Sequence, residues 1–468
     1  MPDVKHIIIV GAGSAGKLLQ KDIEKFHPTA KVVGFVDDTA KKSPSLLGTI
    51  ADLPALTQVY RVDEIIIAIP SIHGEIVRRI LLQNLSHRVP ITIVPRSQDI
   101  IRRGDVTYSM VKPLHYEDFL GRPFVKGDVN TLATMYKDKV VFVTGGAGSI
   151  GSEIVRQLLD IQARKVVIYD NSELLCFNLD QELREKRVSH RRYKIIIGSI
   201  RDGARVAYAI QQTKPDVIFH VAAFKHVYLM EENLAEAIQN NVLGTRILVQ
   251  AAISQRVPHF TFVSTDKVVN PQSVMGATKK LAEYYIQSLP PSQTKFTIVR
   301  FGNVINSQGS VLPLFERQMQ HLKYVTVTDK NMKRFFMSIR EAAQLVIQGT
   351  AHNSHGHIFI LNMGELITIY DVARCLIRSK NLVPEKDIAI KIIGIKKGEK
   401  LEEELFTSKE RTFIAKTRMP HVWRLKKTDT PPRNLLSVLA KLESLAVSYP
   451  NEQKILRELG TIFPSFTQ

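Results

Sequence analysis

"KVVFVTGGAGSIGSEIVRQLLD", residues 139–160, combines an apolar run, a glycine-rich turn and a stretch with helical periodicity. An apolar run that ends in such a turn is typical of a buried parallel strand leading into a helix. A second stretch, "VKHIIIVGAGSAGKLLQKDIEKF" at residues 4–26, repeats the same plan. The chain is therefore predicted to contain two units that begin in the same way.

Apolar strand-like runs alternate with periodic helical stretches after each of these beginnings, as in "DEIIIAIPS" and "PDVIFHVAA". Such alternation favours parallel sheets with helices on both faces. We predict an α/β protein with two Rossmann-like, doubly wound parallel-sheet domains, the second with a smaller C-terminal substrate-binding lobe. The predicted bounds are residues 1–100 for the first domain, 101–136 for a connector and 137–468 for the second domain.

Composition indicates a globular protein, because 44% of the 468 residues are hydrophobic and 23% are charged. The net charge of +19 suits an anionic substrate, but the basic residues are scattered rather than interleaved with aromatic residues, so no nucleic-acid partner is expected. Apolar runs are too short to span a membrane. Cys176 and Cys375 lack the spacing of a metal or disulfide site, which favours the cytoplasm and predicts no metal.

The glycine turn of the second unit predicts a dinucleotide site. Gly145, Gly148 and Gly151 allow the backbone to approach a pyrophosphate at the start of the helix. Asp170 ends the next predicted strand, where a carboxylate accepts hydrogen bonds from a ribose diol and repels a 2′-phosphate. Asn171 follows, and not an arginine, so the pattern favours NAD over NADP.

The first unit carries a similar turn with Gly11, Gly13 and Gly16, followed by Asp37 and Asp38 after the next predicted strand. These residues suit a nucleotide, but the same pattern occurs in domains kept for assembly or regulation. Both interpretations stay open. No set of acid, base and nucleophile in this region indicates catalysis.

From about residue 137 the sequence resembles the extended short-chain dehydrogenase/reductase family. Within it the closest resemblance is to the nucleotide-sugar 4,6-dehydratases that act on UDP-N-acetylglucosamine in polysaccharide biosynthesis. The matching stretches include "VFVTGGAGSIGSEIVRQLL", "FVSTDKVVNPQSVMGATKKLAEYY", "VRFGNVINSQGSVLPLFERQM" and "IKKGEKLEEEL". The resemblance implies a lyase that retains NAD. The N-terminal region resembles the extra Rossmann-like domain of larger members. Those members usually have membrane helices ahead of this domain, and this sequence shows none, so the resemblance implies a soluble form.

By the family pattern, "STDK" supplies most of the catalytic residues. Thr265 would bind the C4 oxygen, Asp266 would protonate the departing C6 hydroxyl, and Lys267 would take the C5 proton. Apolar walls would raise the pKa of Asp266, and a desolvated, cation-rich pocket would keep Lys267 partly neutral. Lys279 would bind the nicotinamide ribose.

Met275 stands where most relatives carry a tyrosine, and a thioether has no proton to exchange. Related dehydratases also carry methionine in the "MGATK" context, so the resemblance favours an active enzyme. The C4 proton would then pass through Thr265, a water or Asp266.

The remaining predicted contacts are of two kinds. Further cofactor contacts would come from Ser149, Ile150, Ser199, Ile200, Ala222, Ala223, Lys225 and Asn241. Ser199 replaces an aspartate that is usual in the family, and Asn241 could equally serve backbone packing. Substrate contacts would come from Lys225, His226, Asn303, Arg334 and Glu399, the last three on resemblance alone.

The predicted function is NAD-dependent 4,6-dehydration of UDP-N-acetylglucosamine, or a related UDP-N-acetylhexosamine, to a UDP-4-keto-6-deoxy sugar. A binding protein without turnover and a UDP-sugar 4-epimerase are the alternatives. We expect a homo-oligomer, although no residue pattern indicates the number of copies.

Overall fold

A computed structural model describes residues 4–39, 44–95, 106–121, 129–350, 356–417, 419, 421–426, 430–448 and 452–466. The predicted boundary at residue 100 and part of the predicted connector lie outside these residues. The chain forms two compact units, a first unit of residues 1–124, 311–332 and 367–394, and a second unit of residues 125–310, 333–366 and 395–468. Two late segments thus group with the first unit, whereas the prediction assigned them to the second domain.

The first unit contains a sheet of mostly parallel strands in the order β3-β2-β1-β4-β5-β6, with only β6 antiparallel to its neighbour among the described pairs. The strands are β1 (Lys5–Val10), β2 (Ala30–Val36), β3 (Leu46–Gly48), β4 (Glu64–Ile67), β5 (Ile91–Ile93) and β6 (Lys112–Pro113). The helical segments are α1 (Ser14–Phe26), η1 (Ile50–Asp52), α2 (Leu53–Val59), α3 (Gly74–Gln83), η2 (Tyr108–Met110) and α5 (Tyr116–Leu120). Apolar residues of β1, β2, β4 and α1 form its core.

The two late segments of the first unit form α14 (Val311–Leu322), β14 (Tyr324–Val327), α16 (Ile369–Ser379) and β18 (Ala389–Ile392), with β14 and β18 paired in parallel. Arg378 on α16 connects these two segments to the rest of the unit by hydrogen bonds. Its guanidinium donates hydrogen bonds to the carbonyl oxygens of Asn84, at 2.7 Å, and Val89. Segments far apart in the sequence therefore share one compact unit.

The second unit is built on a larger sheet with the order β19-β20-β16-β12-β11-β10-β7-β8-β9. Its parallel strands are β7 (Val140–Thr144), β8 (Lys165–Asp170), β9 (Tyr193–Ile197), β10 (Val217–His220), β11 (His259–Thr265), β12 (Lys295–Phe301) and β16 (His357–Leu361). Two antiparallel strands, β20 (Val422–Leu425) and β19 (Ile414–Lys416), follow at one edge. The order reverses between β7 and β10, and ligands bind at such a point in doubly wound sheets.

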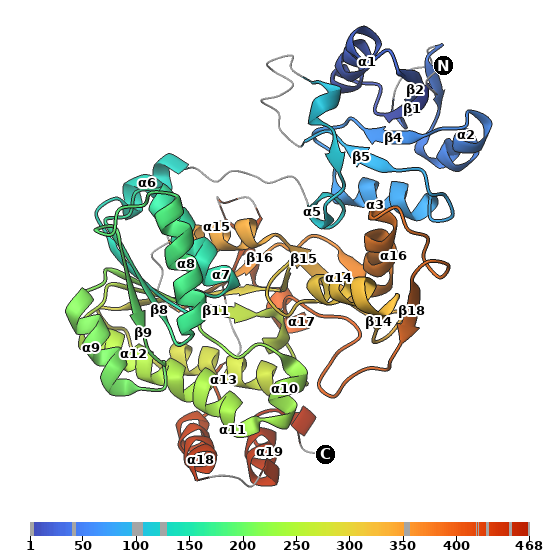
Figure 1. Cartoon of the computed structure of the whole chain (residues 1–468). Helices are drawn as coiled ribbons and strands as arrows, with labels where there is room; N and C mark the ends of the chain where they lie inside the picture. Colours follow the sequence, from blue (N-terminus) through green and yellow to red (C-terminus); the bar gives the residue numbers. More distant parts are fainter. Residues whose placement is uncertain are drawn as a thin grey trace. The chain divides into compact units, whose positions relative to one another are not determined.

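Helices cover both faces of this sheet, with α7, α8 and α15 on one face and α9, α12 and α13 on the other (Figure 1). The helical segments of the second unit are α6 (Val129–Tyr136), α7 (Ser149–Asp160), α8 (Glu173–Glu185), α9 (Gly203–Thr213), α10 (Val227–Glu232), α11 (Leu234–Ala237), the π-helix η3 (Ile238–Leu243), α12 (Gly244–Ser254), η4 (Asp266–Val268), α13 (Val274–Ser288), α15 (Ile339–Thr350), α17 (Ser408–Arg411), α18 (Leu435–Val447), α19 (Glu452–Gly460) and η5 (Pro464–Phe466). Short strands β13 (Asn303–Val304) and β15 (Lys333–Met337) pair in parallel, and β17 spans Leu366–Thr368.

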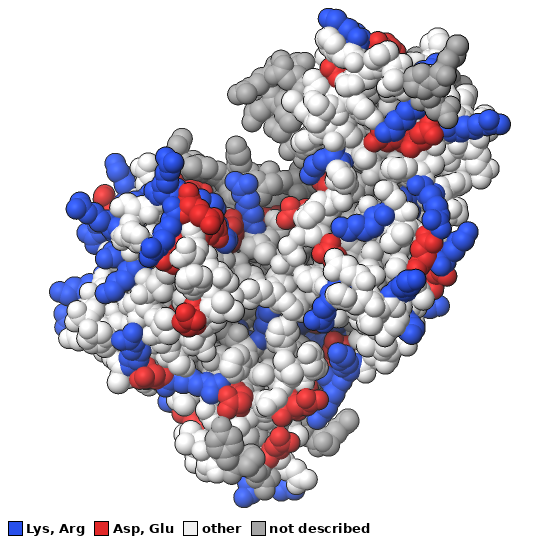
Figure 2. Space-filling view, viewed as in Figure 1, with Lys and Arg blue, Asp and Glu red and all other residues white. Residues whose placement is uncertain are grey.

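The predicted fold class is confirmed by these two doubly wound parallel sheets. Within the described part of the chain, no helix is both long and apolar enough to span a membrane. Cys176 and Cys375 are free thiols inside their units. Lysine and arginine are interspersed with acidic residues over the face in Figure 2, in line with the scattered charge of the sequence.

Candidate active site

The glycine turn after β7 forms a tight backbone cradle at the start of α7. Gly145 has a φ of 62°, and a Cβ on it would lie 2.8 Å from the backbone of Ala222. A Cβ on Gly151 would lie 2.0 Å from the Gly145 carbonyl oxygen. Gly148, the residue before α7, is extended and offers no side-chain cap. The first N–H groups of α7 are thus left for an anion such as a pyrophosphate.

Two side chains support the turn. The buried Asp170 carboxylate, at the end of β8, accepts hydrogen bonds from Ala147 N at 3.1 Å and Ser172 N at 3.0 Å. Ser149 Oγ accepts one from Gln308 N at 3.0 Å, whereas Asn171 is exposed. In the first unit, Asp37 likewise accepts a hydrogen bond from Ala12 N at 2.8 Å. Both units therefore join a glycine turn to the next strand by one carboxylate.

Ser199 and Ile200, two of the predicted cofactor contacts, follow β9. Ser199 Oγ accepts a hydrogen bond from Arg201 N at 3.2 Å. Ile200 is buried, and a Cβ on Gly244 would lie 2.8 Å from its side chain. Ile150, on the first turn of α7, is half-buried. Ile200 therefore packs in the core.

Asn241 lies in the π-helix η3, a feature often found at functional sites. Its Oδ1 accepts from Phe224 N at 2.9 Å and from Asn240 Nδ2 at 3.1 Å. Its Nδ2 donates to Phe224 O at 3.0 Å and Thr278 Oγ1 at 3.1 Å. The amide uses its full hydrogen-bonding capacity within the protein. This favours the packing role: Asn241 holds the loop that carries the half-buried Ala222 and Ala223.

A polar cluster follows the carboxyl end of β11. Thr265 Oγ1 donates a hydrogen bond to Asp266 Oδ1 at 2.9 Å. Lys267 Nζ donates to the same oxygen at 3.0 Å and to Asn303 Oδ1 at 3.1 Å. Asp266 is 1% exposed, and its other oxygen, Oδ2, is buried without a hydrogen-bond partner. Because a buried carboxylate oxygen without a donor is costly, Asp266 Oδ2 is an atom that a bound ligand could contact.

Glu403 joins this cluster and was missed in the sequence analysis. One of its oxygens lies 3.5 Å from Lys267 Nζ and 3.9 Å from Arg334 Nε. Glu403 Oε2, like Asp266 Oδ2, is buried without a hydrogen-bond partner. Glu403 stands between two other glutamates in "LEEEL", and nothing in that run distinguishes it.

The surroundings of Lys267 correct one expectation. Burial by itself lowers the pKa of Lys267, but the charges of Asp266 and Glu403 outweigh burial and raise the pKa above its ordinary value. Arg334 opposes them. The expected cation-rich pocket with a partly neutral amine is therefore wrong for this structure, because two carboxylates face Lys267.

Met275 and Lys279 lie on α13, whose first turn is capped by Ser273. Both side chains are buried. The Lys279 Nζ lies 3.9 Å from the centroid of the Phe262 ring. Burial lowers the pKa of Lys279 to about 7, although the charge of Glu283 acts in the opposite direction. A neutral amine is therefore accessible to Lys279 near neutral pH.

The predicted substrate residues are only partly brought together. Asn303 contacts Lys267, as described above, and the buried Arg334 also donates hydrogen bonds to the carbonyl oxygens of Lys333 and Leu401. Glu399 instead accepts a hydrogen bond from Lys396 N at 3.3 Å.

The other two predicted substrate residues lie on the loop before α10. Lys225 is exposed, and His226 is half-buried. A Cβ on Gly309 would lie 2.4 Å from the His226 ring. His226 is therefore in close contact with the loop that precedes α14.

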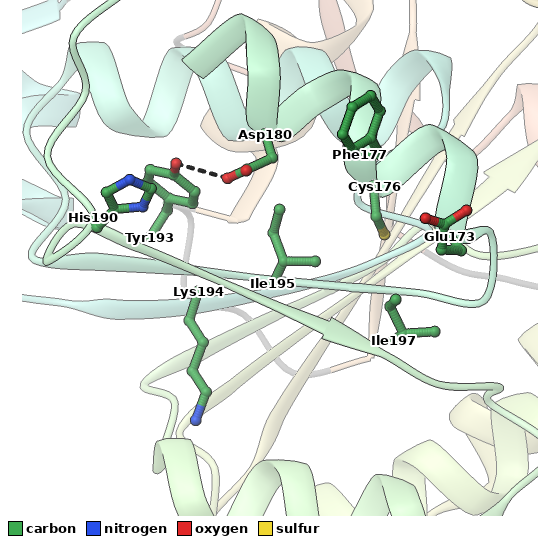
Figure 3. A pocket seen from close by; sticks show the side chains of 9 residues that line it. All are labelled: Glu173, Cys176, Phe177, Asp180, His190, Tyr193, Lys194, Ile195 and Ile197. Atoms are coloured by element: carbon green, nitrogen blue, oxygen red, sulfur yellow. Dashed lines mark hydrogen bonds between the residues drawn. The ribbon is translucent and has the colours of Figure 1, made fainter. Parts of the chain in front are cut away.

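A separate surface pocket of about 400 Å³ lies between α8 and β9 (Figure 3). Cys176, Phe177, Ile195 and Ile197 are among its lining residues. Tyr193 also lines it and donates a hydrogen bond to Asp180 at 2.8 Å. None of the predicted catalytic residues lines this pocket. We place the candidate site at the β11 cluster because a hydroxyl group, an acid and an amine lie together there.

The chain is similar to known proteins along most of its length. A family model described as polysaccharide biosynthesis protein matches residues 141–427, and one described as CoA-binding domain matches residues 3–95. The capsular polysaccharide biosynthesis protein CapD of Staphylococcus aureus is 37% identical over 416 residues, which cover 87% of this chain and 69% of CapD. The probable polysaccharide biosynthesis protein EpsC of Bacillus subtilis is 37% identical over 412 residues, which cover 86% of this chain and 68% of EpsC.

Among solved structures, Pen from Bacillus thuringiensis is 37% identical, with a TM-score of 0.58 over 64% of this chain and 90% of Pen. DesIV, a dTDP-glucose 4,6-dehydratase from Streptomyces venezuelae, shares the fold at 21% identity, with a TM-score of 0.51 over 70% of this chain and 100% of DesIV.

The doubly wound sheet, the glycine turn and the cluster after β11 define an enzyme of the extended short-chain dehydrogenase/reductase type. The chain belongs to the polysaccharide biosynthesis protein family, and this confirms the predicted resemblance.

Proposed function

We propose that the chain is an NAD-dependent 4,6-dehydratase of UDP-N-acetylglucosamine or a related UDP-N-acetylhexosamine. The observation that carries this proposal is the Asp266–Lys267 pair, in which the buried Asp266 Oδ2 has no hydrogen-bond partner. An acid and an amine side by side at the end of a strand suit an elimination, in which one group removes a proton and the other protonates the leaving oxygen.

The residues present fit a dinucleotide. The turn from Gly145 to Gly151 would hold the pyrophosphate at the start of α7, Asp170 the adenosine ribose and Lys279 the nicotinamide ribose. When bound, NAD would accept a hydride from sugar C4 and return one to C6, so that it is regenerated in each turnover. The carboxylate at Asp170 supports NAD over NADP for this role.

The chain's own residues would supply the proton transfers. Thr265 would bind the C4 oxygen and pass the C4 hydroxyl proton to water as the ketone forms. Lys267 would take the C5 proton, and Asp266 would give its proton to the C6 oxygen as the C6–O bond breaks. Lys267 would then return a proton to C5 when C6 receives the hydride. The product is a 4-keto-6-deoxy sugar and water.

The Asp266–Lys267 pair supports this reaction over 4-epimerisation, because an epimerase has no use for a paired acid and amine. Met275 does not separate the two reactions, because both oxidise C4 and a thioether can accept the C4 hydroxyl proton in neither. The buried position of Met275 near the start of α13 suits a packing role beside the C4 site.

Incubation of the purified chain with NAD and UDP-N-acetylglucosamine in heavy water tests the proposal. Mass spectrometry should show a keto sugar that has lost one water and gained solvent deuterium at C5, without accumulation of NADH. UDP-N-acetylgalactosamine as the product would contradict it in favour of an epimerase. Unchanged substrate without deuterium would contradict it in favour of a binding protein.

The Asp266→Asn variant provides the residue-level test. It removes the acid while keeping the side-chain size, so keto-sugar formation should fall by about 10²- to 10⁴-fold. Asp160→Asn, at an exposed position at the end of α7, serves as the matched control and should retain full activity. Equal rates for the two variants would contradict the proposed role of Asp266. The homo-oligomer and the cytoplasmic location stay predictions.

A further inference from the structure

Three consecutive glutamates in the second unit have different surroundings. Glu402 is exposed and pairs with Lys333 at 2.7 Å, and Glu404 is exposed and accepts a hydrogen bond from Asn270 at 3.2 Å. Glu403 is 4% exposed and faces Lys267. Of the three, only Glu403 reaches the candidate catalytic cluster, so its role can be tested against its own neighbours in the chain.

Lys267 is held by three oxygen atoms. Its Nζ lies 3.0 Å from Asp266 Oδ1, 3.1 Å from Asn303 Oδ1 and 3.5 Å from Glu403 Oε1. The contacts with Asp266 and Asn303 are hydrogen bonds, and the contact with Glu403 is an ion pair at a longer distance. The three oxygen atoms come from three separate segments of the chain, which restrains the position of the amino group.

Four charged groups surround this ammonium. Asp266 and Glu403 stabilise its charge, and Arg334 opposes it. Lys400, which donates a hydrogen bond to Val269 O at 2.6 Å, is also close enough to repel it. The two carboxylates prevail, and the pKa of Lys267 lies above its ordinary value.

We infer that Glu403 is a positioning residue of the proposed elimination: its carboxylate holds the Lys267 amino group against Asp266 and sets how firmly that pair keeps its proton. This inference rests on the proposed function. An ammonium cannot accept the C5 proton, so Lys267 must first transfer one proton to Asp266 across their hydrogen bond. One N–H bond breaks, one O–H bond forms, and the charge of the cluster is unchanged.

This transfer produces the two groups that the reaction needs. The neutral amine of Lys267 takes the C5 proton, and the C–H electron pair enters the enolate. Asp266 then gives its proton to the C6 oxygen as the C6–O bond breaks. When C6 receives the hydride, Lys267 returns a proton to C5, and the proton that the C4 hydroxyl released to water is replaced on the pair from water, so that Lys267 is again an ammonium and Asp266 a carboxylate. The Glu403 carboxylate stabilises the ammonium that forms when C5 loses its proton.

The pH dependence of kcat tests this role. Turnover requires one proton on the Asp266–Lys267 pair, so kcat should fall at alkaline pH when that proton is lost. Glu403→Gln keeps the side-chain size but removes the charge, and it should move this alkaline limb to lower pH by about one to three units. Glu402→Gln and Glu404→Gln should leave the profile in place. Glu403→Asp retains the charge at a greater distance and should shift the limb less, in the same direction.

A purely structural role for Glu403 would lower kcat by the same factor at every pH. The inference is therefore overturned if the Glu403→Gln limb coincides with that of the unmodified chain. If Glu403→Gln does not fold, as followed by fluorescence of the single Trp423, the Glu403→Asp profile decides, and a profile without any shift overturns the inference. Failure of the proposed function is distinct, because the unmodified chain and the Glu402→Gln control would then also form no keto sugar.

Discussion

At the scale of single residues, the surroundings shift the pKa values of two lysines of the candidate site in opposite directions. Lys267 faces the carboxylates of Asp266 and Glu403, which raise its pKa despite burial. Lys279 is more deeply buried, its amino group lies over the ring of Phe262, and burial lowers its pKa to about 7. The two side chains have the same chemistry, so their different roles follow from what each one contacts.

Replacement of Lys279 by methionine should change the pH dependence of stability. The unfolded chain keeps the ordinary lysine pKa of 10.5, whereas the folded chain has a value of about 7. Between these values the unfolded state binds more protons, so this lysine makes the free energy of unfolding rise with pH. Lys279→Met should therefore be most stable relative to the unmodified chain below pH 7, with the difference shrinking toward pH 10.

Urea unfolding across this pH range provides the measurement. Lys295→Met, at an exposed position in β12, is the control and should show no such trend. A stability difference between Lys279→Met and the unmodified chain that is the same at every pH would contradict the lowered pKa of Lys279.

At the scale of elements, the junction between β7 and α7 depends on the absence of side chains. The helix starts so close to the strand end that a Cβ on Gly151 would collide with the Gly145 carbonyl oxygen. The same junction would hold the pyrophosphate of the cofactor. Packing and binding therefore constrain one short turn.

Gly151→Ala should displace the start of α7, with a loss of about 1–3 kcal/mol in stability, and should weaken NAD binding. Gly203→Ala is a suitable control, because its Cβ would meet its nearest neighbour at 3.7 Å, at the start of α9. Calorimetric titration with NAD and thermal unfolding would measure both effects. Equal NAD affinity in the two variants would argue against the turn as the binding site.

At the scale of the whole molecule, a buried ion network connects distant segments of the second unit. Arg300 on β12 is fully buried and donates two hydrogen bonds to Glu283 on α13, at 2.8 and 2.6 Å. It also donates to Glu410 on α17 at 2.9 Å. Glu283 accepts a further hydrogen bond from Ser264, next to Thr265, at 2.6 Å. The network thus fixes the end of β11, from which the candidate catalytic cluster begins.

Glu283→Gln would leave the Arg300 charge only partly compensated inside the protein, at a cost of about 3–5 kcal/mol. Glu402→Gln breaks an exposed pair and should cost less than about 1 kcal/mol. Denaturant unfolding followed by Trp423, which lies in β20 of the second unit, would compare the two variants. A cost for Glu283→Gln as small as that for Glu402→Gln would contradict a stabilising role for the network.

Local patterns in the sequence were sufficient for the two doubly wound sheets and the glycine turn, and the resemblance to a known family supplied the Asp266–Lys267 pair. Apolar runs and glycine spacing act over short distances, where the sequence order is also the spatial order. The role of Glu403 depended on tertiary structure, because three adjacent glutamates look alike until folding buries one of them against Lys267. The raised pKa of Lys267 and the packing role of Asn241 follow for the same reason: burial and charge depend on neighbours that the chain brings together from distant positions.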